Sequence, residues 1–223
     1  MSTAQRAAPH LQWSLVVPVK VLARAKTRMS ASAGPHRRAL ALAVATDTVA
    51  AALRCDRVRH VIVVTDDPVA ADELAALGAR VVPDEPDAGL NPALVHGAGR
   101  GRELAPECGV GALSADLPAL RPEELARVLD AAAEAPTAFV PDAAGVGTTL
   151  YTARPGVTFS PAFGGDSRAA HRARGARELL VPDTAGVRRD VDTLDDLRAA
   201  LALGCGPRTT AVARLIIALH TPA

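Results

Sequence analysis

The sequence predicts a single α/β domain built on a mainly parallel sheet. Short apolar runs alternate with longer alanine- and leucine-rich stretches along the 223 residues. The short runs are apolar throughout, which is typical of parallel strands covered on both faces. Apolar residues make up 49% of the chain and charged residues 22%, so a sizeable core can form. Because no linker or repeat divides the chain, we expect one domain over residues 13–223. We expect residues 1–12 to form a flexible tail before it.

Six apolar runs predict the strands. Residues 15–19 form a continuous apolar run, and residues 58–65 form the clearest one, which stops at Asp66-Asp67. The remaining strands are predicted over residues 79–83, 109–114, 137–141 and 148–152.

Helices are predicted between these strands. Residues 37–54 carry apolar side chains at a helical period, and residues 69–77 follow Pro68, which suits the first turn of a helix. Residues 91–103 form a third helix. Residues 121–134 form a fourth, whose first turn holds two acidic residues that suit its positive end.

Composition excludes several classes of function. The formal net charge is +1, which gives no electrostatic reason to expect nucleic acid or a membrane as the partner. No apolar run approaches the roughly 20 residues that cross a bilayer, and residues 1–12 do not resemble a signal peptide. The three cysteines are too widely spaced for a zinc site or a disulfide framework. We therefore expect reduced thiols in a cytoplasmic protein.

Both lysines of the chain lie just after the first strand. All other cationic residues among the 25 are arginines. Lys20, Arg24, Lys26 and Arg28 place four cations in nine residues, a concentration that suits a triphosphate. A solvated basic loop is the alternative. Neither a P-loop pattern nor GxGxxG is present, which disfavours P-loop enzymes and dinucleotide binding.

Aspartates follow further predicted strand ends, where ligands bind in such sheets. Asp116 ends one strand and can hold Mg²⁺ for a nucleotide, or else cap a helix or form a turn. We expect Asp190 and Asp192 also near a strand end, with both side chains on one side of an extended segment. They can ligate a metal or have a purely structural role. Thr193 or Asp192 is a candidate cap for the helix that follows.

Two glycine-rich stretches predict turns or anion sites. Residues 164–167 read Gly-Gly-Asp-Ser before a helical stretch, which can cradle an anion or form an ordinary tight turn. Residues 145–149 form a second such stretch at the start of a strand. We expect His171 to be a structural histidine. No GxSxG pattern exists, so serine hydrolase chemistry has no support.

The order of these motifs is more specific than any one of them. The chain holds Val-Pro-Val-Lys and Ala-Lys-Thr-Arg, then Val-Thr-Asp-Asp, Gly-Leu-Asn and Ala-Asp-Leu-Pro, then Gly-Val-Gly-Thr-Thr, Phe-Gly-Gly-Asp-Ser and Asp-Val-Asp-Thr. Over residues 13 to about 203 this pattern resembles the guanylyltransferases of coenzyme F-420 biosynthesis.

The resemblance implies a three-layer, Rossmann-like nucleotide-diphospho-sugar transferase (GT-A type) fold for the nucleotidyltransferase domain. It implies GTP as co-substrate, Mg²⁺ as metal and a small phosphorylated three-carbon acid as acceptor. A homodimer and hand-over of the product to the next enzyme of the pathway are compatible with it. The implied metal ligands are Asp116, Asp190 and Asp192; the acceptor residues are Thr149, Gly164 and Ser167; the nucleotide residues are Lys20, Lys26, Arg28, Gly89 and Asn91; and the catalytic residues are Lys20, Lys26 and Asp116.

Phosphoenolpyruvate is the favoured acceptor, with 2-phospho-L-lactate as the alternative. Thr148-Thr149 and a composition typical of a GC-rich genome resemble the actinobacterial branch of the family, for which phosphoenolpyruvate is implied. A molybdenum-cofactor type of nucleotidyltransferase usually opens with a glycine-rich loop, where this chain has Pro-Val-Lys. A metal-dependent glycosyltransferase would use Asp190 and Asp192 but leave the lysines without a role. A non-catalytic nucleotide-binding domain would bind GTP without releasing diphosphate.

Overall fold

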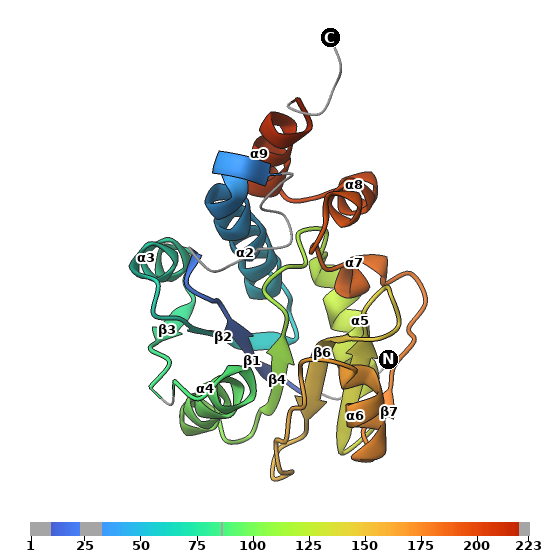
Figure 1. Cartoon of the computed structure of the whole chain (residues 1–223). Coiled ribbons are helices and arrows are strands. Elements are labelled where there is room, and N and C mark those ends of the chain that lie inside the picture. The colour runs from blue at the N-terminus through green and yellow to red at the C-terminus, as the bar shows by residue number, and fades with distance from the viewer. Residues whose placement is uncertain (1–9, 23–32, 86, 219–223) are drawn as a thin grey trace, which may run out of the picture.

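A single sheet organises the part of the chain that the computed structural model describes, which is residues 10–22, 33–85 and 87–218. In these residues the strand order is β3-β2-β1-β4-β6-β5-β7 (Figure 1). The strands are β1 (Trp13–Pro18), β2 (Val58–Val64), β3 (Arg80–Val82), β4 (Gly109–Leu113), β5 (Thr137–Pro141), β6 (Thr148–Ala153) and β7 (Arg177–Glu178). The six predicted strands are all present, and the short β7 is the one that the sequence did not predict.

One strand runs against the others. β1 is parallel to both β2 and β4, whereas β6 is antiparallel to both β4 and β5. β5 therefore runs in the same direction as β4. The sheet is mainly parallel, as predicted, with β6 as the reversed strand.

The helices begin and end close to the predicted residues. Asp67 caps α3 with its side chain and Pro68 is its first residue, while Pro122, Glu123 and Glu124 open α5. The helices are α2 (Arg37–Leu53), α3 (Pro68–Ala76), α4 (Leu90–Leu104), α5 (Pro122–Ala132), α6 (Ser167–Ala173), α7 (Ala185–Arg188), α8 (Leu194–Leu203) and α9 (Pro207–Ala218), preceded by the 3-10 turn η3 (Gly34–His36). Within the described residues none of them is long and apolar enough to cross a membrane.

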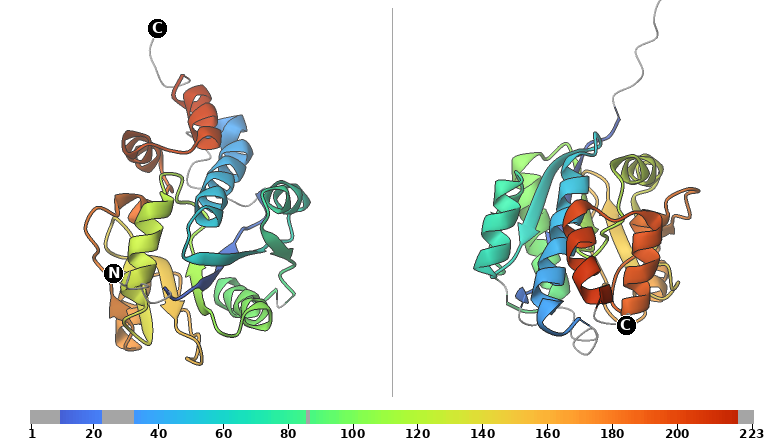
Figure 2. Two further views of the ribbon diagram at one scale, coloured as in Figure 1. Left: turned by 180° about the vertical axis from the view of Figure 1, so that it is seen from behind. Right: turned by 90° about the horizontal axis from the view of Figure 1, so that it is seen from above.

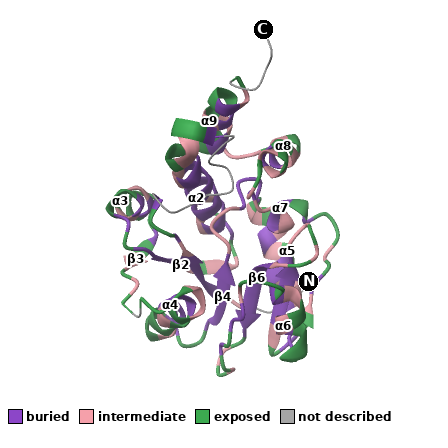
Figure 3. Ribbon diagram, viewed as in Figure 1, coloured by how far each residue is buried: buried purple, intermediate pink, exposed green. Residues whose placement is uncertain are grey.

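The sheet is the middle of three layers. Side chains of α2, α3 and α5 pack on one face, against strand residues that include Leu15, Val17 and Val63. The other face packs against α4, where Val16 and Val110 meet helix residues such as Leu94. The central strands are accordingly buried (Figure 3), and Figure 2 shows the helices on both sides of the sheet. The predicted three-layer α/β fold is confirmed. The boundary proposed at residue 12 stays a prediction, since residues 1–9 lie outside the described part.

Helices α8 and α9 close the carboxyl-terminal part of the chain against α2 (Figure 2). Leu40 and Val44 of α2 form one apolar cluster with Leu197 of α8 and with Ala213 and Ile216 of α9. This cluster is separate from the two that cover the sheet. It fixes the segment that precedes α8, which carries Asp190 and Asp192.

Asp47 of α2 holds the first turn of α9. Its buried carboxylate accepts hydrogen bonds from the backbone N–H groups of Arg208 (3.3 Å) and Thr209 (2.7 Å). The contact needs a glycine at position 206, because a Cβ there would collide with the carboxylate of Asp47. Asp47 therefore acts as a cap supplied by another helix.

We expect Asp47→Ala to lower the free energy of unfolding by roughly 1–3 kcal/mol, because two backbone donors at the start of α9 lose their acceptor. Urea denaturation followed by circular dichroism measures the change. Asp72→Ala, at an exposed position of α3, serves as control and should unfold like the unmodified chain. Equal midpoints for Asp47→Ala and Asp72→Ala would contradict the capping role.

Candidate functional site

A cavity of about 430 Å³ lies where β1 and β4 end. That volume is within the usual range for small-molecule sites. Its wall combines the carboxyl ends of two strands with residues from α2, α4 and two later segments. The lining residues are Pro18, Val19, Lys20, Leu22, Ala41, Val44, Ala45, Leu90, Leu94, Ala112, Leu113, Ser114, Ala115, Asp116, Phe163 and Asp192.

Strand direction brings the polar residues to this edge of the sheet. Lys20, Asp116 and Asp142 follow the carboxyl ends of β1, β4 and β5, which all run the same way. Thr149 reaches the same edge because β6 is reversed and begins there. The backbone N–H of Ser114 donates to the carbonyl of Thr149 at 2.8 Å, which joins the two strands at this edge.

The turn after β1 is fastened by Asp67. One oxygen of its buried carboxylate accepts from the N–H of Leu22 at 2.8 Å, and the other caps the first turn of α3. Burial alone would raise the pKa of Asp67, but the backbone donors together hold it below its usual range. Lys20 is thereby placed at the cavity wall, exposed to solvent. Lys26 and Arg28 lie outside the described residues.

Three aspartates lie close enough to Asp190 to influence its ionisation. Asp116 and Asp192 line the cavity. Burial, followed by the negative charges of Asp116, Asp142 and Asp192, raises the pKa of Asp190 to about 7. Asp142 was not among the residues predicted from the sequence, although it directly follows β5 as Asp116 follows β4.

A backbone hydrogen bond joins the two aspartate segments. The N–H of Val191 donates to the carbonyl of Asp116 at 3.1 Å. Val191 is fully buried, so the neighbouring Asp190 and Asp192 face away from the core, as the period of an extended segment predicts. The expectation that this segment follows a strand was wrong: it follows α7 and leads into α8.

The start of α8 is capped by Thr193. Its hydroxyl accepts from the N–H of Asp196, and the carboxylate of Asp196 accepts from the N–H of Thr193, which makes a capping box. This cap leaves Asp192 for the cavity. In the described residues, however, no three acidic, histidine or cysteine side chains form a metal-binding cluster in their present positions. A cation would have to draw the carboxylates together.

The reversed strand β6 and helix α6 are joined by His171. Its Nε2 accepts from the N–H of Ala162 at 2.9 Å, so its Nδ1 carries the proton and faces the hydroxyl of Thr148 at 3.0 Å. The ring is fully buried and stacks on Phe139 and Tyr151. Burial lowers the pKa of His171 to about 4. These contacts give it the structural role that the sequence predicts.

The predicted acceptor residues lie on these two elements. Thr149 is buried, and its hydroxyl has no hydrogen-bond partner among the described residues. Ser167 is the buried first residue of α6, whereas Gly164 is exposed with a φ of 103° in the loop before it. None of the three is among the described residues that line the cavity, where Phe163 forms this side of the wall.

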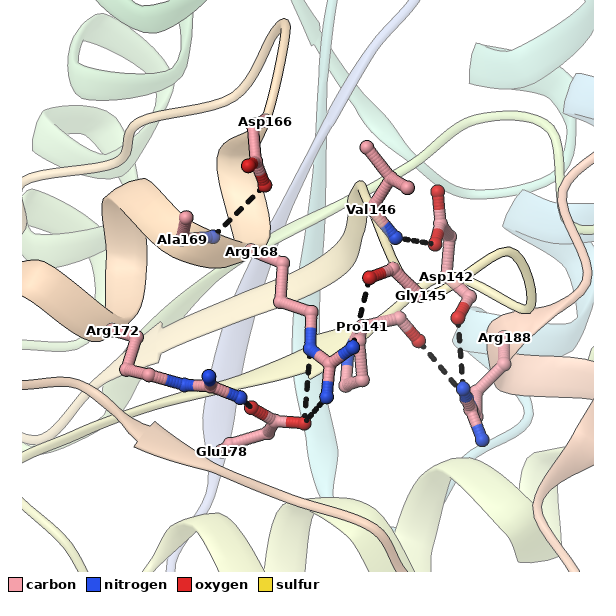
Figure 4. A network of polar contacts seen from close by, with 10 residues as sticks. All are labelled: Pro141, Asp142, Gly145, Val146, Asp166, Arg168, Ala169, Arg172, Glu178 and Arg188. Atoms are coloured by element: carbon pink, nitrogen blue, oxygen red, sulfur yellow. Dashed lines mark hydrogen bonds and ion pairs between the residues drawn. The ribbon is translucent and has the colours of Figure 1, made fainter.

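An arginine network fixes the turn between β5 and β6 (Figure 4). Arg168 of α6 donates to Glu178 at 2.7 Å and to the carbonyl of Gly145 at 2.8 Å. Arg188 donates to the carbonyl of Asp142 at 2.8 Å, and the carboxylate of Asp142 accepts from Val146 at 2.9 Å. The network holds the turn that connects Asp142 to Thr149. The sequence offers no local signal for it, because its partners come from distant segments.

Gly89 and Asn91 lie at the start of α4, whose residues Leu90 and Leu94 line the cavity. Gly89 has a φ of 100° and precedes the helix, a conformation that favours glycine. The amide of Asn91 donates to the carbonyl of Phe163 at 3.0 Å and accepts from its N–H at 2.8 Å. Asn91 therefore joins the start of α4 to Phe163, and its predicted contact with a nucleotide stays a prediction.

Comparison with known proteins identifies relatives over nearly the whole chain. Residues 13–217 match the model of the family described as guanylyl transferase CofC like. The chain is 71% identical to a phosphoenolpyruvate guanylyltransferase of Thermomonospora curvata, over 91% of this chain and 89% of that protein. It is 64% identical to one of Streptomyces coelicolor, over 93% and 99% of the two chains.

Solved structures share the fold. A nucleotide-diphospho-sugar transferase from Desulfovibrio desulfuricans superimposes with a TM-score of 0.66 at 17% identity, covering 92% of this chain and 97% of that one. Rv0371c of Mycobacterium tuberculosis, solved in complex with manganese, superimposes with a TM-score of 0.51 at 22% identity, covering 86% and 98%. These likenesses agree with the predicted nucleotide-diphospho-sugar transferase fold.

His171 makes the stability of the fold depend on pH. Because its pKa falls from 6.5 to about 4 on folding, the unfolded chain takes up a proton between these values that the folded chain does not. Its contribution is complete above pH 6.5 and is lost as the pH falls towards 4, by about 2 kcal/mol between pH 7 and pH 5. Urea denaturation at pH 7, 6 and 5 should therefore show a shallower pH dependence for His171→Gln. Equal pH dependences would show that the folded chain protonates His171.

Proposed function

The chain belongs to the guanylyl transferase CofC-like family, and on this premise we propose that it transfers the guanylyl group of GTP to phosphoenolpyruvate. The observation that carries the proposal is a cavity that Lys20, Asp116 and Asp192 all line. A cation and carboxylates arranged in this way suit a triphosphate and the metal that accompanies it.

The proposed reaction exchanges one phosphate bond for another. A phosphate oxygen of phosphoenolpyruvate attacks the α-phosphorus of GTP and forms the new P–O bond. The bond from the α-phosphorus to the bridging oxygen of the β-phosphate breaks, and that electron pair leaves with diphosphate. The attacking oxygen is already ionised near neutral pH, so the chain needs to supply charge neutralisation and in-line placement rather than a base.

The donor set fits a hard divalent cation such as Mg²⁺, which prefers carboxylate oxygens. Asp116, Asp190 and Asp192 would hold it. Burial, followed by the charges of neighbouring aspartates, raises the pKa of Asp190, and a bound cation would favour its ionised form. When bound, the ion would neutralise charge on the phosphates. The manganese complex of Rv0371c, which shares the fold, agrees with a divalent metal.

The lysines are the proposed partners of the triphosphate. Lys20 lies at the cavity wall on a turn that Asp67 fastens, so its backbone is fixed while its ammonium can follow the substrate. A compact ammonium on a flexible stem can adjust as the geometry of the phosphate changes during transfer, in a way that a planar guanidinium cannot. We propose the same role for Lys26, supported by Arg28. Gly89, at the start of α4, is proposed to face the nucleotide.

The acceptor is proposed to bind beside Thr149, Gly164 and Ser167. The buried hydroxyl of Thr149 is a donor for a phosphate or carboxylate, and an unpartnered buried hydroxyl costs free energy unless a ligand satisfies it. Phosphoenolpyruvate is preferred over 2-phospho-L-lactate because relatives with 60–71% identity carry that activity in their names.

Release of diphosphate tests the function directly. With GTP and Mg²⁺ we expect release in the presence of phosphoenolpyruvate, and much less with 2-phospho-L-lactate or 3-phosphoglycerate. ATP in place of GTP is the control for selection of the guanine base. Asp116→Ala should lower turnover at least about 100-fold, because the transition state loses a charged partner, while circular dichroism remains unchanged.

Asp72→Ala, remote from the cavity, should react like the unmodified chain. Absence of release with all three acceptors would overturn the proposed function. Near-normal turnover of Asp116→Ala would instead remove Asp116 from the metal site.

Thr149→Val separates substrate binding from stability. The change preserves shape and removes the hydroxyl, so we expect KM for phosphoenolpyruvate to rise about 10- to 100-fold, the range for a lost hydrogen bond to a charged group. KM for GTP should change little, and the melting temperature should stay equal or rise, because the hydroxyl has no partner among the described residues. A lower melting temperature with unchanged KM would assign Thr149 a structural role only.

A further inference from the structure

Thr48 joins α2 to the segment that carries Asp116. Its side chain is fully buried. The hydroxyl donates to the carbonyl of Val44, one helical turn earlier, at 2.7 Å, and accepts from the backbone N–H of Leu117 at 3.0 Å. The first contact is common for threonine in helices, whereas the second crosses 69 residues of sequence.

The N–H of Leu117 belongs to the same peptide group as the carbonyl of Asp116. That carbonyl accepts from Val191, at 3.1 Å. One planar peptide group is therefore held at both ends, by Thr48 on one side and by the backbone between Asp190 and Asp192 on the other. Because a peptide group is rigid, fixing both ends fixes its rotation and restricts the backbone of Asp116.

We propose that Thr48 is a positioning residue that aligns Asp116 with Asp190 and Asp192 for binding a divalent cation. This inference rests on the proposed function, which assigns these three carboxylates to the metal. Without the hydroxyl, the peptide group keeps its link to Val191 but loses its link to α2.

The chain offers a matched control at Thr46. This residue is also buried in α2, and its hydroxyl donates to the carbonyl of Leu42 at 2.8 Å, as Thr48 does to Val44. Thr46→Val and Thr48→Val therefore remove equivalent bonds within the helix. Thr48→Val additionally removes the acceptor of Leu117.

Binding of Mn²⁺ alone, followed by the electron paramagnetic resonance signal of the free ion, tests the proposal without relying on turnover. We expect Thr48→Val to bind Mn²⁺ about tenfold more weakly than the unmodified chain. Thr48→Ser, which keeps the hydroxyl, should restore binding, and Thr46→Val should bind normally. In the diphosphate assay, Thr48→Val should need about tenfold more Mg²⁺ for half-maximal rate, with KM for GTP little changed once Mg²⁺ saturates.

Normal Mn²⁺ binding by Thr48→Val would overturn the inference, as would equal losses in Thr46→Val and Thr48→Val. If Thr48→Val does not fold, Thr48→Ala takes its place with the same expected losses. An unmodified chain that releases diphosphate but does not bind Mn²⁺ would also overturn the inference, while the proposed function would stand. An unmodified chain that releases no diphosphate overturns the proposed function itself.

Discussion

Strand direction is the constraint on which the candidate site depends. β1, β4 and β5 deliver Lys20, Asp116 and Asp142 from their carboxyl ends, and the reversed β6 delivers Thr149 from its beginning. Burial raises the pKa of Asp190 to about 7, and the charges of the neighbouring aspartates add to this effect. The backbone hydrogen bond between Val191 and Asp116 joins the two aspartate segments regardless of charge.

Two consecutive residues of α2 form hydrogen bonds with segments next to this edge. Asp47 holds the first turn of α9, and Thr48 holds the peptide group after Asp116. A further backbone bond, from the N–H of Gly206 to the carbonyl of Pro118 at 2.9 Å, joins the start of α9 to the same loop. Helix α2, helix α9 and the loop after β4 thus form one hydrogen-bonded unit.

Features determined by neighbouring residues could be predicted from the sequence. The apolar run of β2 and the Asp67-Pro68 start of α3 lie within a few residues of the signals that identify them. Contacts across long separations could not, because nothing in a helix sequence distinguishes Thr48 from Thr46. The partnership of Asp67 with Leu22 spans 45 residues and is equally hidden. The spacing of Asp190 and Asp192 was recognisable in the sequence, but their place between α7 and α8 was not predicted, because the expected strand before them is a helix in the structure.

A transfer reaction needs its two substrates fixed relative to each other. Asn91 contributes by joining α4 to Phe163 with two hydrogen bonds. His171 accepts from the N–H of Ala162, which directly precedes Phe163, and contacts Thr148, which directly precedes the proposed acceptor residue Thr149. With a pKa of about 4, His171 stays neutral near pH 7 and keeps both contacts. The proposed acceptor residues therefore lie beside groups whose charge does not change at neutral pH, whereas the proposed metal ligands are carboxylates, whose charge a cation would neutralise.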